Sequence, residues 1–197
     1  MESIESVLTK RFTVIPSIKR LGDLAAALKG DCSAILLTGA DIANLKPLAK
    51  KVHAAGKQVL VNMELLGGFG RDQAGIKLLK NYYGVDGVMS TDSSRLGMAR
   101  HAGLYTIQRF LISDSRALDT SLRILKGSAA HAAEILPAVI GVMIIEKLRQ
   151  VAAMPLLAGG FIQSAETLDQ VRAAGFNGAT ISRRDLWDWH SSDNKRV

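Results

Sequence analysis

The sequence predicts an α/β fold, in the form of a single-domain (β/α)8 barrel that spans residues 1–197. Short apolar segments alternate with helix-like segments eight times, and no Pro- or Ser-rich linker divides the chain. Apolar residues make up 48% of the sequence, which suits parallel strands that are buried on both faces. No glycine-rich dinucleotide fingerprint follows the first strand, so a closed barrel is favoured over an open doubly wound sheet.

Each predicted strand is a short run of apolar and β-branched residues. The strands span 13–18, 33–38, 58–64, 87–90, 104–110 and 133–137, and the last two lie within 156–162 and 178–184. The barrel core is expected at about 13–189, and residues 190–197 read as a short tail.

A helix is expected after every strand. The predicted helices span 23–28, 45–55, 72–83, 94–102, 115–126, 139–151, 164–174 and a stub at 184–189. In the second of these, Leu45, Leu48 and Val52 have helical spacing, and Gly56 ends the helix. Asp72 is the expected N-cap of the third helix.

The chain is basic, with a net charge of +7 and a pI near 9.7. This excess fits either a polyanionic partner or ordinary solubility charge. No apolar run reaches the roughly 18 residues that span a bilayer, and the first residues do not resemble a signal peptide. Cys32 is the single cysteine and is expected to be an inert packing residue. We therefore expect a cytoplasmic protein without a membrane segment.

The last two strands end in residues that suit an anion. Gly159 and Gly160 follow the seventh strand, and Ser182 and Arg183 follow the eighth. In parallel barrels the loops after these strands commonly hold a ligand phosphate. Glycines allow close approach to the backbone, and N–H groups that open the next helix point at the anion. The pattern predicts a site for a small phosphorylated metabolite.

Charged residues at other strand ends are further candidates for the mouth of the barrel. Glu64 and Glu134 stand among apolar strand residues, so each carboxylate needs a partner. The hydroxyls of a polyol, a divalent metal, or the cations Arg109 and Lys19 are three such partners. The fork of Arg109 matches phosphate oxygens, and an ion pair with Glu134 would orient it.

The sequence gives little support for catalysis, so we expect no catalytic residue, metal or cofactor. The four histidines, His53, His101, His131 and His190, have no ligand spacing to one another. No lysine lies inside a strand, as a Schiff-base aldolase would require. An isomerase, aldolase or synthase that acts on a phosphorylated triose or polyol is the alternative, with Glu64 as base and Arg109 as anion clamp.

Six motifs follow one another along the chain. They are Asn62-Met63-Glu64-Leu65-Leu66-Gly67-Gly68-Phe69, Gly87-Val88-Met89-Ser90-Thr91, Thr106-Ile107-Gln108-Arg109, Glu134-Ile135-Leu136-Pro137, Leu157-Ala158-Gly159-Gly160-Phe161-Ile162, and Ala179-Thr180-Ile181-Ser182 with Leu186-Trp187. In this order they resemble one known family, the glycerol-3-phosphate-responsive antiterminators. The resemblance runs from about Val14 to Trp187. Two departures lie beside the expected pocket: Ala138 stands where a glycine is expected, and Arg183-Arg184-Asp185 replaces an Asn-Lys-like step.

The resemblance implies a non-enzymatic barrel that senses glycerol 3-phosphate and acts on the leader mRNA of a glycerol uptake operon. By matching motif, the implied ligand site comprises Glu64, Arg109, Glu134, Gly159, Gly160 and Ser182. Lys19 and Arg183 join this set as mouth cations. A homo-oligomer is a further expectation, since the apolar stretch 139–145 fits a dimer face as well as a buried barrel helix.

Overall fold

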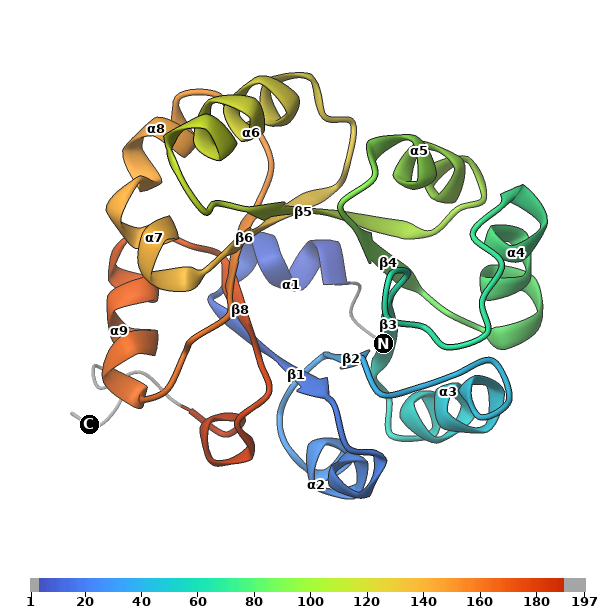
Figure 1. The fold of residues 1–197 in the computed structure, drawn as a ribbon. Coiled ribbons are helices and arrows are strands. Elements are labelled where there is room, and N and C mark those ends of the chain that lie inside the picture. The colour runs from blue at the N-terminus through green and yellow to red at the C-terminus, as the bar shows by residue number, and fades with distance from the viewer. Residues whose placement is uncertain (1–3, 190–197) are drawn as a thin grey trace.

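A computed structural model describes residues 4–189 of the chain and confirms the predicted barrel (Figure 1). Eight parallel strands close in sequence order, each hydrogen-bonded to the next and β8 to β1. Their bounds are β1 Thr13–Ile18, β2 Ala34–Leu37, β3 Gln58–Asn62, β4 Gly87–Ser90, β5 Tyr105–Leu111, β6 Ala132–Leu136, β7 Leu156–Gly159 and β8 Gly178–Ile181. The first six lie within two residues of their predicted bounds, and β7 and β8 lie within 156–162 and 178–184 as predicted.

Helices surround the barrel. They are α1 Ile4–Lys10, α2 Leu24–Lys29, α3 Leu45–Ala54, α4 Gln73–Leu78, α5 Ser93–His101, α6 Ser115–Gly127, α7 Ala138–Met143, α8 Ile145–Arg149 and α9 Ala165–Ala173. Two 3-10 turns, η1 Leu21–Asp23 and η3 Arg184–Leu186, and the π-helical turn η2 Leu79–Tyr83, which continues α4, complete the set. The predicted helix 139–151 is wrong as one element, because the chain breaks at Ile144 between α7 and α8. None of the described helices is long and apolar enough to cross a membrane.

Asp and Ser side chains cap the N-termini of four helices. Asp72 is the predicted N-cap of α4, and its Oδ1 accepts the Gly75 N–H at 2.8 Å. Asp92 and Asp114 cap α5 and α6 in the same way, and Ser164 caps α9. Each cap satisfies backbone donors that have no partner within the helix.

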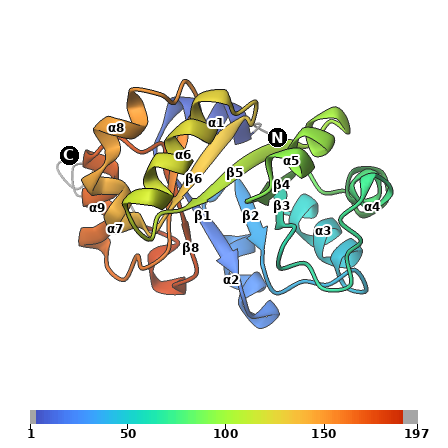
Figure 2. The ribbon, with the colours of Figure 1, turned by 45° about the horizontal axis from the view of Figure 1, so that its top comes forward.

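The sequence analysis did not predict α1, which lies across the end of the barrel where the strands begin (Figure 2). Ile4, Val7 and Leu8 are buried, and their spacing gives the helix one apolar face. Ile4 and Leu8 pack against inward-facing strand residues such as Leu36 and Ile107. The helix therefore closes the lower opening of the barrel with apolar side chains.

His131 lies at the lower end of β6 and gives the fold a predicted pH dependence. Its Nδ1 accepts the backbone N–H of Thr106 at 3.0 Å, which requires an unprotonated nitrogen. Burial, and then the charge of Arg100, lower the pKa of His131 from its usual 6.5. The folded state therefore binds fewer protons than the unfolded state, and stability falls as the pH drops through 6.5.

We expect the urea midpoint of the protein to be lower at pH 5.5 than at pH 8, and His131→Gln to remove part of this difference. Urea titrations of both proteins at the two pH values measure it. An unchanged pH response in His131→Gln would show that His131 does not contribute.

Candidate functional site

The upper, carboxyl-terminal end of the barrel interior is polar. Alternation along the strands places Ser17 above the buried Ile15 and Arg109 above Ile107, so both face inward. The Ser17 Oγ and the Thr38 Oγ1 lie 3.3 Å apart at the ends of β1 and β2. An apolar interior therefore ends in a layer of hydroxyl and charged groups, which is where barrel enzymes and binding proteins hold ligands.

An ion pair stands at the centre of this polar layer. Arg109 and Glu134 are directly opposite each other on β5 and β6, and Nε of Arg109 donates to Oε2 of Glu134 at 2.5 Å. The side chain of Glu134 is only 1% exposed, and its Oε1 accepts a hydrogen bond from the Thr180 hydroxyl. The predicted pairing of Arg109 with Glu134 is confirmed, and it leaves the buried carboxylate with a donor on each oxygen.

Gly159 is glycine for a packing reason that was not expected. It lies opposite Thr180 on β8, and a Cβ built on it would come within 2.7 Å of Glu134 Oε1 and 2.8 Å of Thr180 Oγ1. The glycine therefore makes room for the Glu134 carboxylate and its hydroxyl partner. A direct contact of Gly159 with a ligand stays a prediction.

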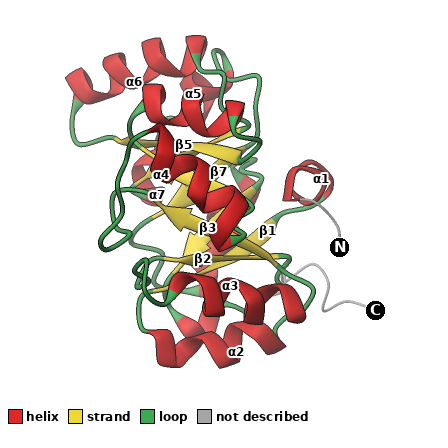
Figure 3. Cartoon of the chain, turned by 90° about the vertical axis from the view of Figure 1, so that its right-hand side faces the viewer, coloured by secondary structure: helices red, strands yellow, loops and turns green. Residues whose placement is uncertain are grey.

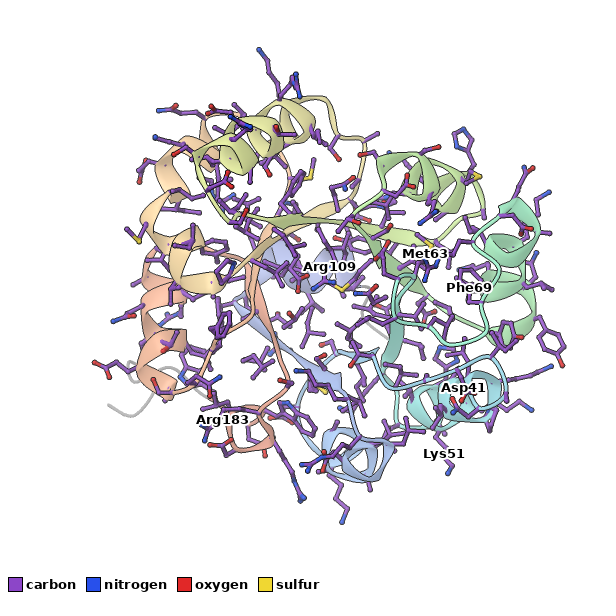
Figure 4. All side chains as sticks on the ribbon, viewed as in Figure 1. Asp41, Lys51, Met63, Phe69, Arg109 and Arg183 are labelled. Atoms are coloured by element: carbon purple, nitrogen blue, oxygen red, sulfur yellow. The ribbon has the colours of Figure 1, made fainter. Side chains whose placement is uncertain are left out.

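Arg109 keeps most of its hydrogen-bonding capacity. A guanidinium has five N–H donors, and only Nε of Arg109 binds another described residue. The side chain is 20% exposed and lies inside the ring of strands, as Figure 4 shows. Its two terminal amino groups are therefore available to a ligand oxyanion in the mouth.

The turn after β7 differs in detail from the predicted helix-terminus site. Gly160 and Phe161 both have positive φ angles, 75° and 58°, and helix α9 begins only at Ala165. A bulky residue rarely adopts the left-handed conformation, which is commonly found at functional sites. Phe161 is also 73% exposed. Five residues separate the end of β7 from the start of α9.

The loop after β8 forms the other part of the rim. Ser182 and Arg183 line an open hollow of about 560 Å³ together with Arg20, Arg184 and Asp185. The Arg183 guanidinium donates two hydrogen bonds to the Asp185 carboxylate, and this contact lowers the pKa of Asp185. Figure 4 shows Arg183 outside the ring of strands, on the β8 side.

Two more of the predicted residues lie on or near this rim. Lys19 is exposed directly after β1, the strand that pairs with β8. The hydroxyl of Ser182 bonds to no described residue, and Ser182 is not the cap of the short η3 turn. The two final strands therefore end at one side of the mouth, as predicted, and cations surround that side.

Glu64 lies in the turn after β3 and not in the strand, because β3 ends at Asn62. Its Oε1 accepts a hydrogen bond from the Ser90 hydroxyl at 2.5 Å, while its Oε2 is buried and has no hydrogen-bond partner. Neither Arg109 nor Lys19 contacts it, so those two predicted partners are wrong. A buried carboxylate oxygen without a donor is costly.

The backbone around Glu64 is held firmly. Oδ1 of the buried Asn62 accepts the Glu64 N–H at 2.9 Å. Arg71 returns from the end of the same loop and donates to the carbonyl oxygens of Met63 and Glu64 at 3.1 and 2.9 Å. The described residues contain no group of three potential metal ligands.

The described histidines and Cys32 occupy structural positions. His53 contacts Asp86 at 2.8 Å, His101 contacts the Gly97 carbonyl, and His131 bonds to β5. His190 lies outside the described residues. Burial raises the pKa of the Cys32 thiol, as expected for an inert packing residue.

Three hydroxyl residues at the mouth were missed by the sequence analysis: Ser17, Thr38 and Thr180. Side chains on a strand alternate between its two faces, and this alternation could have identified them. Thr180 lies two positions before Ser182, and Ser17 lies two positions after Ile15.

Comparison with known proteins identifies the family. The model of the glycerol-3-phosphate responsive antiterminator family matches residues 14–187. The Escherichia coli K12 protein named uncharacterized protein YgcP is 29% identical over 184 residues, which cover 91% of this chain and 94% of that protein.

Solved structures agree with this match. A glycerol uptake operon antiterminator regulatory protein from Listeria monocytogenes is 29% identical, with a TM-score of 0.83 over 90% of this chain and 96% of that chain. An antiterminator-related protein from Thermotoga maritima shares the fold with a TM-score of 0.79, at 22% identity over 91% of this chain and 99% of that chain. The family match covers the whole barrel from β1 to the buried Trp187, and this chain belongs to the glycerol-3-phosphate responsive antiterminator family.

Proposed function

We propose that this protein is a glycerol 3-phosphate-responsive regulator that binds the leader mRNA of glycerol metabolism genes and prevents premature termination of transcription. The proposed ligand rests on the geometry of Arg109. The buried Glu134 holds its Nε, and its terminal N–H groups bond to no described residue. Family membership supports a regulatory role rather than an enzymatic one.

The mouth offers complementary groups for both ends of glycerol 3-phosphate. The phosphate binds between Arg109 and the rim after β7 and β8, where Gly160, Ser182 and Arg183 lie. Lys19 adds positive charge on the neighbouring strand. At the opposite side, the unpartnered Oε2 of Glu64 accepts a hydrogen bond from a glycerol hydroxyl. A diol phosphate therefore meets cations at one end and an acceptor at the other.

Family membership and the positive net charge of +7 support the proposed RNA partner. Glycerol 3-phosphate raises RNA affinity only to the extent that it binds the RNA-competent conformation more tightly than the other. The coupling is reciprocal, so RNA raises the affinity for glycerol 3-phosphate by the same factor.

The ligand part is tested by thermal unfolding with glycerol 3-phosphate, glycerol or inorganic phosphate. We expect glycerol 3-phosphate to raise the melting temperature and glycerol at equal concentration to leave it unchanged, because a bound ligand stabilises the native state by mass action. Ser182→Ala should reduce the affinity about tenfold, since a hydrogen bond to a charged group contributes roughly 1.5–3 kcal/mol.

Ser94→Ala is the matched control, because Ser94 is exposed on α5 and its hydroxyl bonds to no described residue. Its shift with glycerol 3-phosphate should equal that of the unaltered protein. A shift of the same size with glycerol alone, or none with glycerol 3-phosphate, would contradict the proposed ligand.

A further inference from the structure

The net positive charge of this protein arises from one part of the chain. Residues 45–127 contain thirteen Lys and Arg residues and six Asp and Glu residues, a net charge of +7. The rest of the chain contains twelve of each and is neutral. The whole excess therefore belongs to the segment that begins with α3 and ends with α6.

This segment forms one continuous side of the barrel. Helices α3, α4, α5 and α6 follow one another around the outer wall (Figure 1), and the side view of Figure 3 shows this wall from the front. Helix α3 contacts η2, and α4 contacts α5. The excess of basic residues is therefore on one side of the molecule as well as in one part of the sequence, and it produces a positive electrostatic field on that side.

The acidic residues of this wall are largely engaged in local structure. Asp72, Asp92 and Asp114 accept backbone N–H groups at helix N-termini, and Asp86 contacts His53 and the Val59 N–H. Many of the basic residues, in contrast, are exposed and form no hydrogen bond or ion pair with the described residues. They include Lys50, Lys51, Lys77, Lys80, Arg123 and Lys126.

A cleft of about 360 Å³ opens in this wall between α5 and α6. Leu96 and Ile124 line it together with Arg100 and Arg123. The Arg100 guanidinium donates to the Ala129 carbonyl, whereas Arg123 bonds to no described residue. No heavy atom lies within 4 Å of a Cβ built on Gly97, so the α5 side is open. Apolar surface beside arginine planes suits an unstacked base, and the surrounding cations suit phosphates.

The cleft lies on the outer face of β5, and the ligand mouth lies on its inner face. Gln108 faces the cleft, where its Nε2 donates to the Thr91 carbonyl and its Oε1 accepts from the Ser93 hydroxyl, both at 2.9 Å. The next residue, Arg109, faces the mouth. A polymer on the outer wall and a metabolite in the mouth can therefore be bound together.

We propose that the α3–α6 wall is the surface that binds single-stranded RNA, with an unstacked base in the α5–α6 cleft. This inference rests on the proposed RNA partner and assigns its location. RNA is favoured over an acidic protein because the unpaired cations lie on α3, α4, η2 and α6 along one wall, which matches a repeated phosphate charge along a strand.

The test measures binding of the full chain to a fluorescein-labelled 20-nucleotide oligouridylate by fluorescence anisotropy at several salt concentrations. Arg123→Gln/Lys126→Gln removes two charges from the α3–α6 wall. We expect about tenfold weaker binding and a decrease of about 1.4 in the slope of log affinity against log salt, since each phosphate contact on a single strand contributes about 0.7.

Lys29→Gln/Lys147→Gln is the matched control, because it removes two charges from exposed residues of the neutral part of the chain. Its affinity should stay within twofold of the unaltered protein. Lys50→Gln/Lys51→Gln on α3 provides a second pair if the α6 variant does not fold, and it should behave as the α6 variant does. Equal losses in the control and wall variants would overturn the assigned surface.

The same proteins are also tested for the melting shift with glycerol 3-phosphate. A retained shift together with lost RNA binding supports the α3–α6 wall as a surface separate from the ligand site. Intact RNA binding in the wall variants overturns this inference and leaves the proposed function standing. Failure of the unaltered protein to bind the oligonucleotide at any salt concentration, with and without glycerol 3-phosphate, overturns this inference and favours an acidic protein as the occupant of the wall. Loss of the glycerol 3-phosphate shift in the unaltered protein would instead contradict the proposed ligand.

Discussion

Replacement of Arg109 by alanine is expected to lower the free energy of unfolding by about 3–5 kcal/mol, as for other buried ion pairs that lose one partner. Glu134 would remain 1% exposed with its charge, while only the Thr180 hydroxyl still donates to it. The response to glycerol 3-phosphate should disappear as well, because the mouth loses its central guanidinium. Urea unfolding followed by circular dichroism measures the first effect, and a thermal shift measures the second.

Two variants separate the charge effect from general damage to the barrel. Arg109→Ala/Glu134→Gln removes both charges and should recover much of the lost stability, although not the ligand response. Arg116→Ala, an exposed position on α6, should change the free energy of unfolding by no more than about 0.5 kcal/mol. If Arg109→Ala were as mild as Arg116→Ala, the ion pair would have no structural role.

The second large effect is expected at the lower end of the barrel. Leu8→Ala should cost about 2–5 kcal/mol, the range for a leucine truncated in a core. Leu8 is 1% exposed and packs in the barrel interior with Ile15 and Leu60. Its truncation would leave a cavity that the closed ring of strands can fill only partly. Urea unfolding at constant pH measures the change.

Leu78→Ala is the comparison for Leu8→Ala, because Leu78 is on a helix but is 49% exposed. A much smaller loss is expected there, since little apolar surface returns to water. Equal losses in the two variants would mean that α1 does not contribute its buried face to the stability of the barrel.

The architecture could be predicted from the sequence because parallel strands and their helices leave strong local signals. Fully buried strands give short apolar runs, and glycines such as Gly84 and Gly103 end the helices before the next strand. Parallel strands also end on the same side of the barrel, so the meeting of the β7 and β8 turns and of Arg109 with Glu134 followed from strand order.

Other features depend on packing that strand order does not reveal. The apolar face of α1 is visible in its spacing, but its location beneath the barrel requires the closed ring that it fills. The reason for glycine at position 159 is the carboxylate of Glu134, which is 25 residues earlier in the chain. The sequence predicted Glu64 inside the third strand because residues 58–64 form one continuous run. In the structure β3 ends at Asn62, whose side chain accepts the Glu64 N–H.

Because α1 closes the lower end, the barrel is open at its upper end only. A small molecule in the mouth enters and leaves on the Arg109 side, because Ile4 and Leu8 occupy the other end. Any macromolecule that covered the rim near Phe161 and Arg183 would therefore slow both arrival and departure of the metabolite. The metabolite would then stay bound longer whenever the rim is covered, even if its equilibrium affinity for the protein is unchanged.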